Sequence, residues 1–139
     1  MSRPVKPRRV RHLPRVTYFK PMGTPMHRLK ETIITVDELE ALRLKDLEGI
    51  DQRRCADQMG VAQSTLQRIL ASARKKLTGA IVGGNALRIE GGSYSISDRV
   101  TCKRCRHGWR RNILYNERGR AGGSPRACPS CGYEHDEED

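Results

Sequence analysis

The amino-acid sequence predicts a mainly α protein, in which a three-helix domain follows an extended basic arm and precedes a small β ribbon. Two observations support this fold class. Between residues 31 and 92, apolar side chains recur at the three- and four-residue spacing of helices. Residues 93–133 combine paired cysteines, glycines and a β-prone segment. The boundaries we expect are an arm over 1–30, the helical domain over 31–92, the ribbon over 93–133 and a disordered acidic tail over 134–139.

The composition excludes several classes of protein. Only 36% of the 139 residues are hydrophobic and six are aromatic, which is too few for a large enzyme core with a deep pocket. The sequence also offers no nucleophile–base pair, carboxylate dyad or phosphate loop. No run approaches the roughly 18 apolar residues of a membrane helix, and no apolar segment of a secretory signal follows the N-terminus. We therefore expect a cytoplasmic, nucleoid-associated protein that is not an enzyme and has no membrane partner.

Positive charge is concentrated in two segments. The net charge is +11, and residues 1–30 contain nine Lys or Arg and no acidic residue. Residues 93–133 contain nine basic and two acidic residues, whereas 31–92 are neutral and 134–139 hold five acidic residues. Two basic segments favour a polyanionic partner, because each neutralised phosphate releases counterions. The alternative is that these segments only keep the protein soluble.

The arm is expected to be extended rather than helical. Five prolines in the first 25 residues alternate with Arg and Lys, and proline fixes φ and removes an N–H donor. Val16-Thr17-Tyr18-Phe19 is a short β-prone run within the arm. Its two aromatic residues would pin the arm to the next domain.

Three helices are predicted from their caps and apolar faces. Thr35 and Glu38 form a capping box before a helix that ends at Gly49. Asp51 caps a second helix that runs to Met59 and is broken by Gly60. A third helix opens near Ala62 or Gln63 and ends at Gly83-Gly84, and its apolar residues fall on one face: Leu66, Ile69, Leu70, Ala73 and Leu77. Ala86–Glu90 is then predicted to form a short strand, and residues 91–93 a linker.

The segment from Gln52 to Ile69 has the spacing of a helix-turn-helix. The small Ala56 stands where two helices would cross, and Gly60 lies four residues later in the turn. Cys55 occupies a packing position and is interpreted as a small buried hydrophobe. The alternative is an ordinary three-helix bundle without a ligand.

A helix-turn-helix would place the start of the third helix in the DNA major groove. The exposed residues there that would read bases are Gln63, Ser64, Gln67 and Arg68. The residues expected to serve phosphates or a minor groove are Thr65, Arg74, Arg8, Arg9 and Arg11. Each of them is equally compatible with a solvated surface position.

The other four cysteines predict a metal site. Cys102, Cys105, Cys128 and Cys131 form two C-x2-C pairs separated by 22 residues, the spacing of a zinc ribbon. One structural zinc ion is the favoured cofactor, a rubredoxin-like iron site is the next alternative, and disulfides or free thiols follow. Four cysteine ligands leave no open position for catalysis.

The remaining ring residues of the ribbon have less specific roles. We expect His107 and His135 to be surface residues rather than ligands. Trp109 and Tyr115 are expected to serve as ribbon core, with stacking on bases as the alternative.

Several segments of the chain resemble a prokaryotic family labelled domain of unknown function 134. They are Arg8-Arg9-Val10, Tyr18–Pro21, Thr35–Asp46, Gly60-Val61, Gln67–Leu70 and Ala86–Gly92. The resemblance covers about residues 1–92 and implies a helix-turn-helix domain similar to sigma factor region 4, and a DNA-binding protein. The ribbon lies outside it and depends on its own cysteine spacing.

The favoured hypothesis is a transcriptional regulator that binds double-stranded DNA through the third helix and the arm. The zinc ribbon would add a nucleic-acid or protein contact. One alternative is an interaction protein that docks on RNA polymerase, and another is an RNA- or ribosome-associated factor. A redox or metal sensor would follow if the cysteines held metal weakly. A monomer and a homodimer are both compatible with the sequence, in which no dedicated dimerisation segment is evident.

Overall fold

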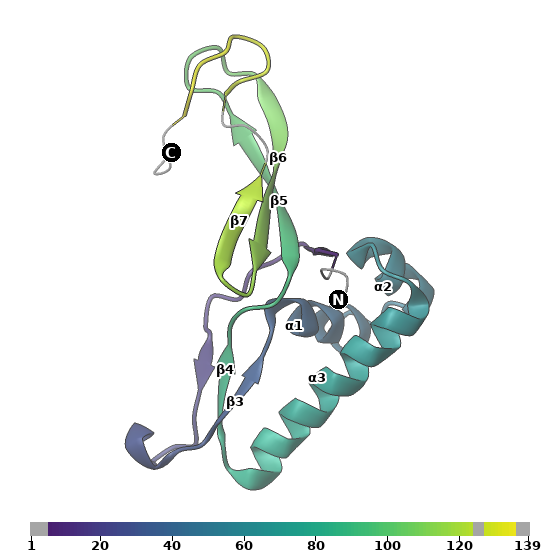
Figure 1. Cartoon of the computed structure of the whole chain (residues 1–139), viewed down its shortest axis with the longest axis vertical. Helices are drawn as coiled ribbons and strands as arrows, with labels where there is room; N and C mark the ends of the chain where they lie inside the picture. Colours follow the sequence, from purple (N-terminus) through teal and green to yellow (C-terminus); the bar gives the residue numbers. More distant parts are fainter. Residues whose placement is uncertain (1–5, 124–126, 136–139) are drawn as a thin grey trace, which may run out of the picture.

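The computed structural model describes residues 6–123 and 127–135. Within them the chain forms three α-helices, namely α1 (Val36–Leu42), α2 (Gln52–Met59) and α3 (Gln63–Gly83). A 3-10 turn, η1 (Met26–Arg28), and a π-helical turn, η2 (Arg43–Leu47), accompany them. The strands are β1 (Arg8–Val10), β2 (Tyr18–Phe19), β3 (Glu31–Ile34), β4 (Ala86–Ile89), β5 (Tyr94–Thr101), β6 (Gly108–Asn116) and β7 (Gly119–Gly123). Figure 1 shows the helices towards one end of the molecule and the long β5–β6 hairpin reaching to the other.

The expectation of a mainly α protein is wrong, because two β-sheets stand beside the helices and make this an α/β fold. One sheet has the order β2-β4-β3 and the other the order β1-β5-β6-β7. Strands β1, β2 and β3 are two to four residues long, which is too short for an alternating pattern to be recognised. Their partners lie far along the chain, since β2 and β3 flank β4 and β1 pairs with β5.

The predicted starts of the three helices and the ends of the second and third follow local chemistry and are confirmed. The first helix, expected to run to Gly49, instead ends as α1 at Leu42 and is followed by the π-helical turn η2 up to Leu47. The Thr35 hydroxyl accepts a hydrogen bond from the Glu38 N–H at 3.4 Å, and Glu38 Oε1 accepts one from the Thr35 N–H at 3.1 Å. Asp51 Oδ1 accepts from the Arg54 N–H at 2.9 Å at the start of α2. Gly60 ends α2 with a φ of 69°, which a residue without a Cβ adopts at little cost. Helix α3 begins after Ala62, which provides no side-chain cap.

The helices share one apolar core. The α2–α3 pair packs on α1 and η2 through buried residues: Ala41, Leu42, Leu44, Cys55, Ala56, Met59, Leu66, Ile69, Leu70 and Ala73. Cys55 is fully buried and its thiol lies 3.3 Å from the Ile50 carbonyl oxygen, so it is the packing residue that its position predicted. Contacts of this kind fix the angle between α3 and α2, which at 8 residues would not be stable alone.

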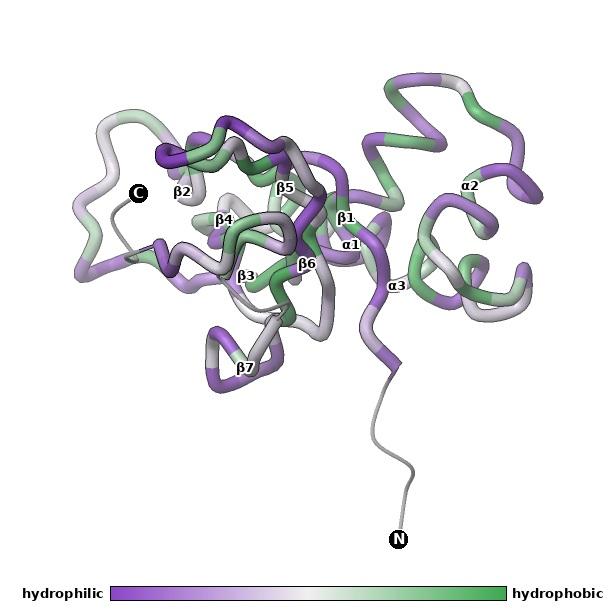
Figure 2. Tube along the Cα trace, turned by 90° about the horizontal axis from the view of Figure 1, so that it is seen from above, coloured by the Kyte–Doolittle hydropathy of each residue, from purple (hydrophilic) through white to green (hydrophobic). Residues whose placement is uncertain are grey.

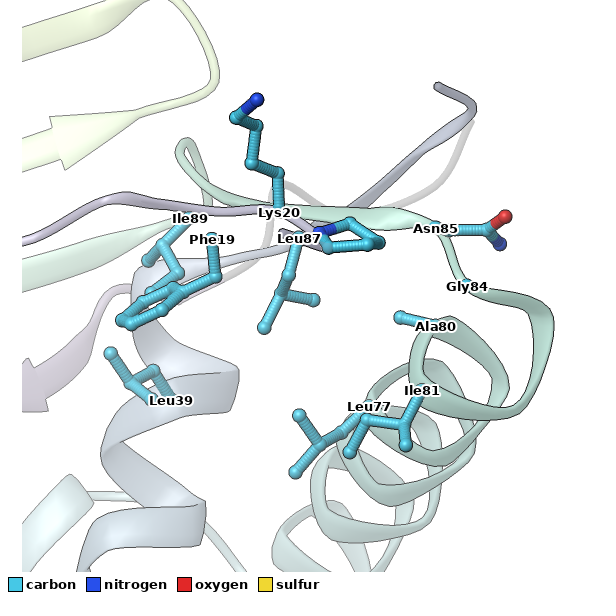
Figure 3. Close-up of a pocket in the computed structure, with 11 residues that line it drawn as sticks. Phe19, Lys20, Leu39, Leu77, Ala80, Ile81, Gly84, Asn85, Leu87 and Ile89 are labelled. Atoms are coloured by element: carbon cyan, nitrogen blue, oxygen red, sulfur yellow. The ribbon is translucent and has the colours of Figure 1, made fainter. Parts of the chain in front are cut away.

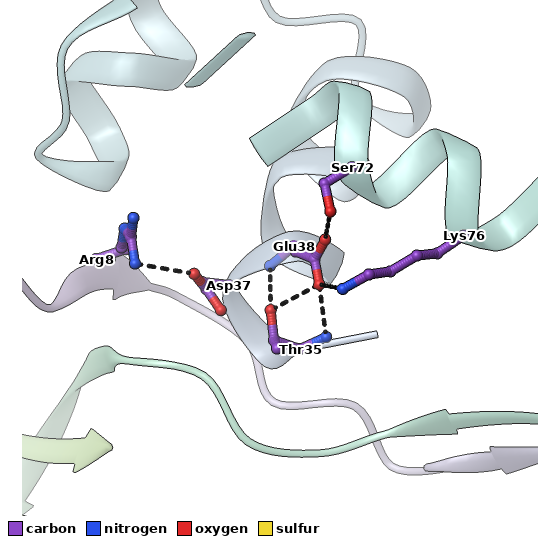
Figure 4. Close-up of polar contacts among 6 residues, drawn as sticks. All are labelled: Arg8, Thr35, Asp37, Glu38, Ser72 and Lys76. Carbon is purple, nitrogen blue, oxygen red and sulfur yellow. Dashed lines mark hydrogen bonds and ion pairs between the residues drawn. The ribbon is translucent and has the colours of Figure 1, made fainter. Parts of the chain in front are cut away.

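Helix α1 is joined to α3 by a buried carboxylate. Glu38 Oε2 accepts from the Ser72 hydroxyl at 2.7 Å and Glu38 Oε1 accepts from Lys76 Nζ at 2.8 Å (Figure 4). Burial disfavours the charged form, but the hydrogen bonds from Lys76, Ser72 and Thr35 outweigh burial and hold the pKa of Glu38 below its usual range. The capping residue therefore also fixes the position of the long helix.

The basic arm is part of the fold. Strand β1 runs parallel to β5 with Arg8 beside Tyr94 and Val10 beside Ile96, and the Arg8 N–H donates to the Ser93 carbonyl at 3.1 Å. Figure 2 shows β1 lying between the helical part and strands β5 and β6. The aromatic run expected to pin the arm forms β2, which pairs with β4. The backbone of the arm is thus held in place at β1 and β2.

The three-stranded sheet and the C-terminal half of α3 border an open apolar hollow of about 490 Å³. Figure 3 shows Leu77 and Ile81 of α3 facing Leu87 of β4 across it, with Phe19 and Leu39 at one side. Within the described part of the chain, no helix has the length and apolar character needed to cross a membrane.

Candidate functional site

The four cysteines of the ribbon meet at the far end of the β5–β6 hairpin. Their sulfur atoms all lie within 4.8 Å of one another, although the two C-x2-C pairs are separated by strands β6 and β7. Cys102 Sγ lies 3.7 Å from Cys131 Sγ, and Cys105 Sγ lies 3.5 Å from Cys128 Sγ. Figure 1 shows the β5–β6 loop and the segment 127–135 side by side at this end.

The two pairs are held by the same backbone arrangement. The Cys102 N–H donates to the His107 carbonyl and the Arg106 N–H donates to the Cys102 carbonyl, both at 2.9 Å. In the second pair, the N–H of Cys128 donates to Tyr133 and that of Gly132 donates to Cys128, again at 2.9 Å. Arg106 and Gly132 take the same place in the turn, with φ of 62° and 76°. Two similar turns therefore present two sulfurs each towards one point.

This geometry fits a tetrahedral metal ion. A Zn–S bond of about 2.3 Å sets neighbouring sulfurs of a tetrahedron about 3.8 Å apart, close to the separations of 3.7 and 3.5 Å found here. Burial opposes the Cys102 thiolate, but hydrogen bonds from the Cys105 N–H and from His135 outweigh it and lower the pKa of Cys102 to about 5. A hydrogen bond from the His107 backbone favours the Cys105 thiolate, yet burial and the adjacent thiols raise the pKa of Cys105 to about 12. A cation among the four sulfurs would stabilise all four thiolates, so that the pKa of Cys105 would no longer be raised by the adjacent thiols.

His135 does not have the surface position that we expected. It is 8% exposed and packs edge-on against Tyr133, with ring centroids 4.9 Å apart, beside the cysteine cluster. Trp109 lies 5.7 Å from the His135 ring and is half-buried, while His107 is exposed. Tyr115 stacks on Tyr94 at 4.8 Å within a second apolar cluster. The sequence carried no signal for the burial of His135, because two of the residues it contacts, Trp109 and Cys102, lie far from it along the chain.

A second feature is a basic hollow at the start of α3. About 900 Å³ of open space is lined by Lys6 and Arg8 of the arm and by Thr65 and Arg68 of α3. Arg68 is exposed and Thr65 is half-buried. Arg8 is held by Asp37, with Nη1 3.5 Å from Oδ2 (Figure 4). The fold therefore brings together arm and helix residues that are some 60 positions apart in the chain.

The other residues proposed for DNA contact fall into two groups. Gln63 and Ser64 are exposed at the first turn of α3, and Gln67 Nε2 lies 3.3 Å from Gln52 Oε1. By contrast, Arg74 is two turns further on and is paired with Asp46 of η2, at 2.7 and 3.1 Å. That bidentate contact lowers the pKa of Asp46 and gives Arg74 a partner within the protein.

Arg9 and Arg11 of the arm point to a different hollow. It is shared with Arg110 of β6, and its walls are otherwise polar and apolar uncharged residues and His12. The Arg9 guanidinium also lies at the α2–α3 turn, where a Cβ on Gly60 would be 3.4 Å from Arg9 Nε. Sequence reasoning missed Lys6 and Arg110 as site residues; the only signal was their positive charge.

Fold and sites together define an α/β protein with a four-cysteine cluster suited to a metal ion and a basic surface built from the arm, α3 and the ribbon. The chain belongs to the family described as "Protein of unknown function DUF134", whose family model matches residues 1–97. The family suggested by the arm and helix motifs is thereby confirmed.

Relatives extend the match over nearly the whole chain. A UPF0251 protein of Halothermothrix orenii is 45% identical over 139 residues, covering 99% of this chain and 100% of the relative. A UPF0251 protein of Moorella thermoacetica is 47% identical over 135 residues, covering 96% and 85%. One from Pelotomaculum thermopropionicum is 45% identical over 132 residues, covering 94% and 93%. No solved structure matches the chain.

Proposed function

We propose that the protein is a DNA-binding transcriptional regulator that contacts double-stranded DNA through α3 and the basic arm. The observation that carries this proposal is the hollow lined by Lys6, Arg8, Thr65 and Arg68. It combines exposed groups at the start of a helix that follows a short turn with cations from a fixed arm, which is the arrangement that helix-turn-helix proteins use on the major groove. Arg68 and Gln63 are the residues suited to read base edges.

The roles of the other residues follow from their surroundings. Thr65 and Arg8 are suited to phosphates, because both line the hollow and can donate hydrogen bonds. The contact of Arg8 with Asp37 involves Nη1 at 3.5 Å, whereas Nε and Nη2 of Arg74 both bond to Asp46, at 3.1 and 2.7 Å. Arg74 is assigned to the ion pair with Asp46 rather than to DNA. Zinc is the proposed occupant of the four-cysteine site, because four thiolates in a closed tetrahedral set are the usual ligands of a structural zinc ion.

The test is an in vitro selection of fragmented genomic DNA by zinc-loaded protein at about 0.15 M salt, since non-specific binding weakens steeply as salt rises. We expect the wild type to recover a sequence motif and Arg68→Ala to lose it. Arg28→Ala is the matched control: it removes one exposed positive charge in η1, away from α2 and the start of α3 (Figure 1), and should recover the same motif.

Two results would contradict the proposal. Binding that has no sequence preference and fades with salt would leave only electrostatic attraction. Capture of purified RNA polymerase by the wild type, with no motif recovered from DNA, would favour the alternative of a polymerase-docking protein.

A further inference from the structure

One face of the β1–β5–β6 sheet carries positive charge, and none of its described side chains is a carboxylate. In the sheet register Arg9 lies beside Ser95, Ser97 lies opposite Asn112, and Arg99 lies opposite Arg110. Because side chains alternate along a strand, these residues share a face. It is the same face that borders the hollow of about 540 Å³ lined by Arg9, Arg11, His12, Arg110, Ser95 and Ser97.

The cations of this face have no acidic partner in the part of the chain that the structure describes. Among the described residues, Arg9, Arg11, Arg99 and Arg110 form no ion pair, and no acidic residue lines the hollow. Arg99 and Arg110 are exposed and directly opposite each other on neighbouring strands. Like charges in that position repel each other, and an anion bound between them would offset this repulsion.

The hollow adjoins the basic hollow at α3. Arg9 lines the first of them, and its Nε would lie 3.4 Å from a Cβ on Gly60, which lines the second. Strand β1 runs between the two, with Arg8 on one side and Arg9 on the other, because consecutive side chains point to opposite faces. Positive charge therefore continues from the start of α3, across the arm, to the ribbon strands.

We infer that this face, formed by Arg9, Arg11, Arg99 and Arg110 with the Ser95 and Ser97 hydroxyls, binds the phosphate backbone of the same DNA duplex that α3 contacts. The ligand class is backbone phosphate, because a surface of guanidinium groups and hydroxyls without an apolar slot for bases suits phosphate oxygens rather than base edges. The ribbon would then set the position of the duplex and leave sequence reading to α3. This inference rests on the proposed function.

The experiment compares single variants in affinity and salt dependence on the selected duplex. Arg11→Ala and Arg110→Ala should each weaken binding about threefold to tenfold and reduce the slope of log K against log salt by about one, equally on unrelated duplexes. Arg118→Ala is the matched control, because Arg118 is an exposed ribbon arginine that lines a different hollow, and it should leave both quantities unchanged. Metal content and thermal unfolding check that each variant is folded.

The outcomes separate this inference from the proposed function. If the wild type recovers a motif that Arg68→Ala loses, but Arg11→Ala and Arg110→Ala behave like Arg118→Ala, the ribbon face is not a DNA contact and only the inference fails. A loss seen on single-stranded RNA and not on duplex DNA also overturns it. If the wild type does not bind duplex DNA, both fail.

Discussion

The backbone N–H of Arg11 donates a hydrogen bond of 2.6 Å to Oε2 of Glu40, a carboxylate on α1 that is only 2% exposed. The Oε1 atom of the same carboxylate accepts from Arg43 Nε at 2.7 Å. One buried acidic residue therefore fixes both the end of strand β1 and the start of the η2 turn. It explains how an arm rich in proline and arginine holds a defined course over the surface.

Replacing this acceptor should release the arm. Glu40→Ala leaves the Arg11 N–H without its acceptor and the Arg43 guanidinium with only the 3.4 Å contact to Glu48, so we expect a loss of about 3 kcal/mol in the free energy of unfolding. Trypsin should also cleave faster after Arg11 and Arg15. Glu40→Gln keeps an acceptor oxygen and should lose less. Urea unfolding and a trypsin time course measure both effects, and cleavage at the wild-type rate in Glu40→Ala would show that the contact does not hold the arm.

Acid should weaken the junction of α1 and α3 through Glu38. Its pKa is lowered in the folded protein by the contacts with Lys76, Ser72 and Thr35, so its contribution is complete above the unfolded pKa of about 4.3 and is lost as pH falls through the folded value. We expect the free energy of unfolding to decline from about pH 6 to pH 3. Glu38→Gln should cost about 1 to 3 kcal/mol at pH 7 and flatten this decline.

The control for Glu38 is Glu48→Gln, because the Glu48 side chain is 51% exposed and its removal should change stability by less than about 0.5 kcal/mol. Urea unfolding at a series of pH values gives both curves. If the free energy of unfolding of Glu38→Gln falls with decreasing pH as steeply as that of the wild type, the acid sensitivity comes from other carboxylates.

Metal should be stoichiometric and depend on the ribbon cysteines only. Purified protein is expected to carry about one zinc ion per chain, and Cys105→Ser should lose the metal together with ribbon folding, because so small a sheet depends on its metal. Cys55→Ala is the control, since Cys55 is buried among the helices. This variant should keep its zinc. Elemental analysis and the tryptophan fluorescence of Trp109 report the two properties. Full metal content in Cys105→Ser would refute the site.

Two positions of the first cysteine turn should respond oppositely to glycine. Arg106 is the one non-glycine residue with positive φ in the described part of the chain, at 62°, and the left-handed region costs such a residue about 1 kcal/mol. Arg106→Gly should therefore strengthen metal retention severalfold in competition with a chelator. Arg104→Gly removes the same charge at an exposed position without that strain, so it should weaken retention. Equal effects of both changes would show that charge, not backbone conformation, governs the turn.

The helix caps, the helix break and the cysteine pairs could be predicted from the sequence. The capping box at Thr35, the cap at Asp51, the break at Gly60 and the C-x2-C pairs are each decided by residues within a few positions of one another, and the structure has all four. The family was also recognisable from contiguous motifs in the arm and helices. Such features need only short-range interactions, so a single sequence specifies them.

Long-range pairing was decided by the tertiary structure alone. The arm became strands β1 and β2 because β5 and β4, about 70 to 85 residues later in the chain, offered edges with unpaired N–H and C=O groups. The same pairing turned Arg8 towards α3, and Arg9 and Arg11 towards the ribbon. The packing of segment 127–135 on β6 buried His135 beside the cysteines. Which cations share a surface depends on strand register and packing, and neither is set by neighbours in sequence.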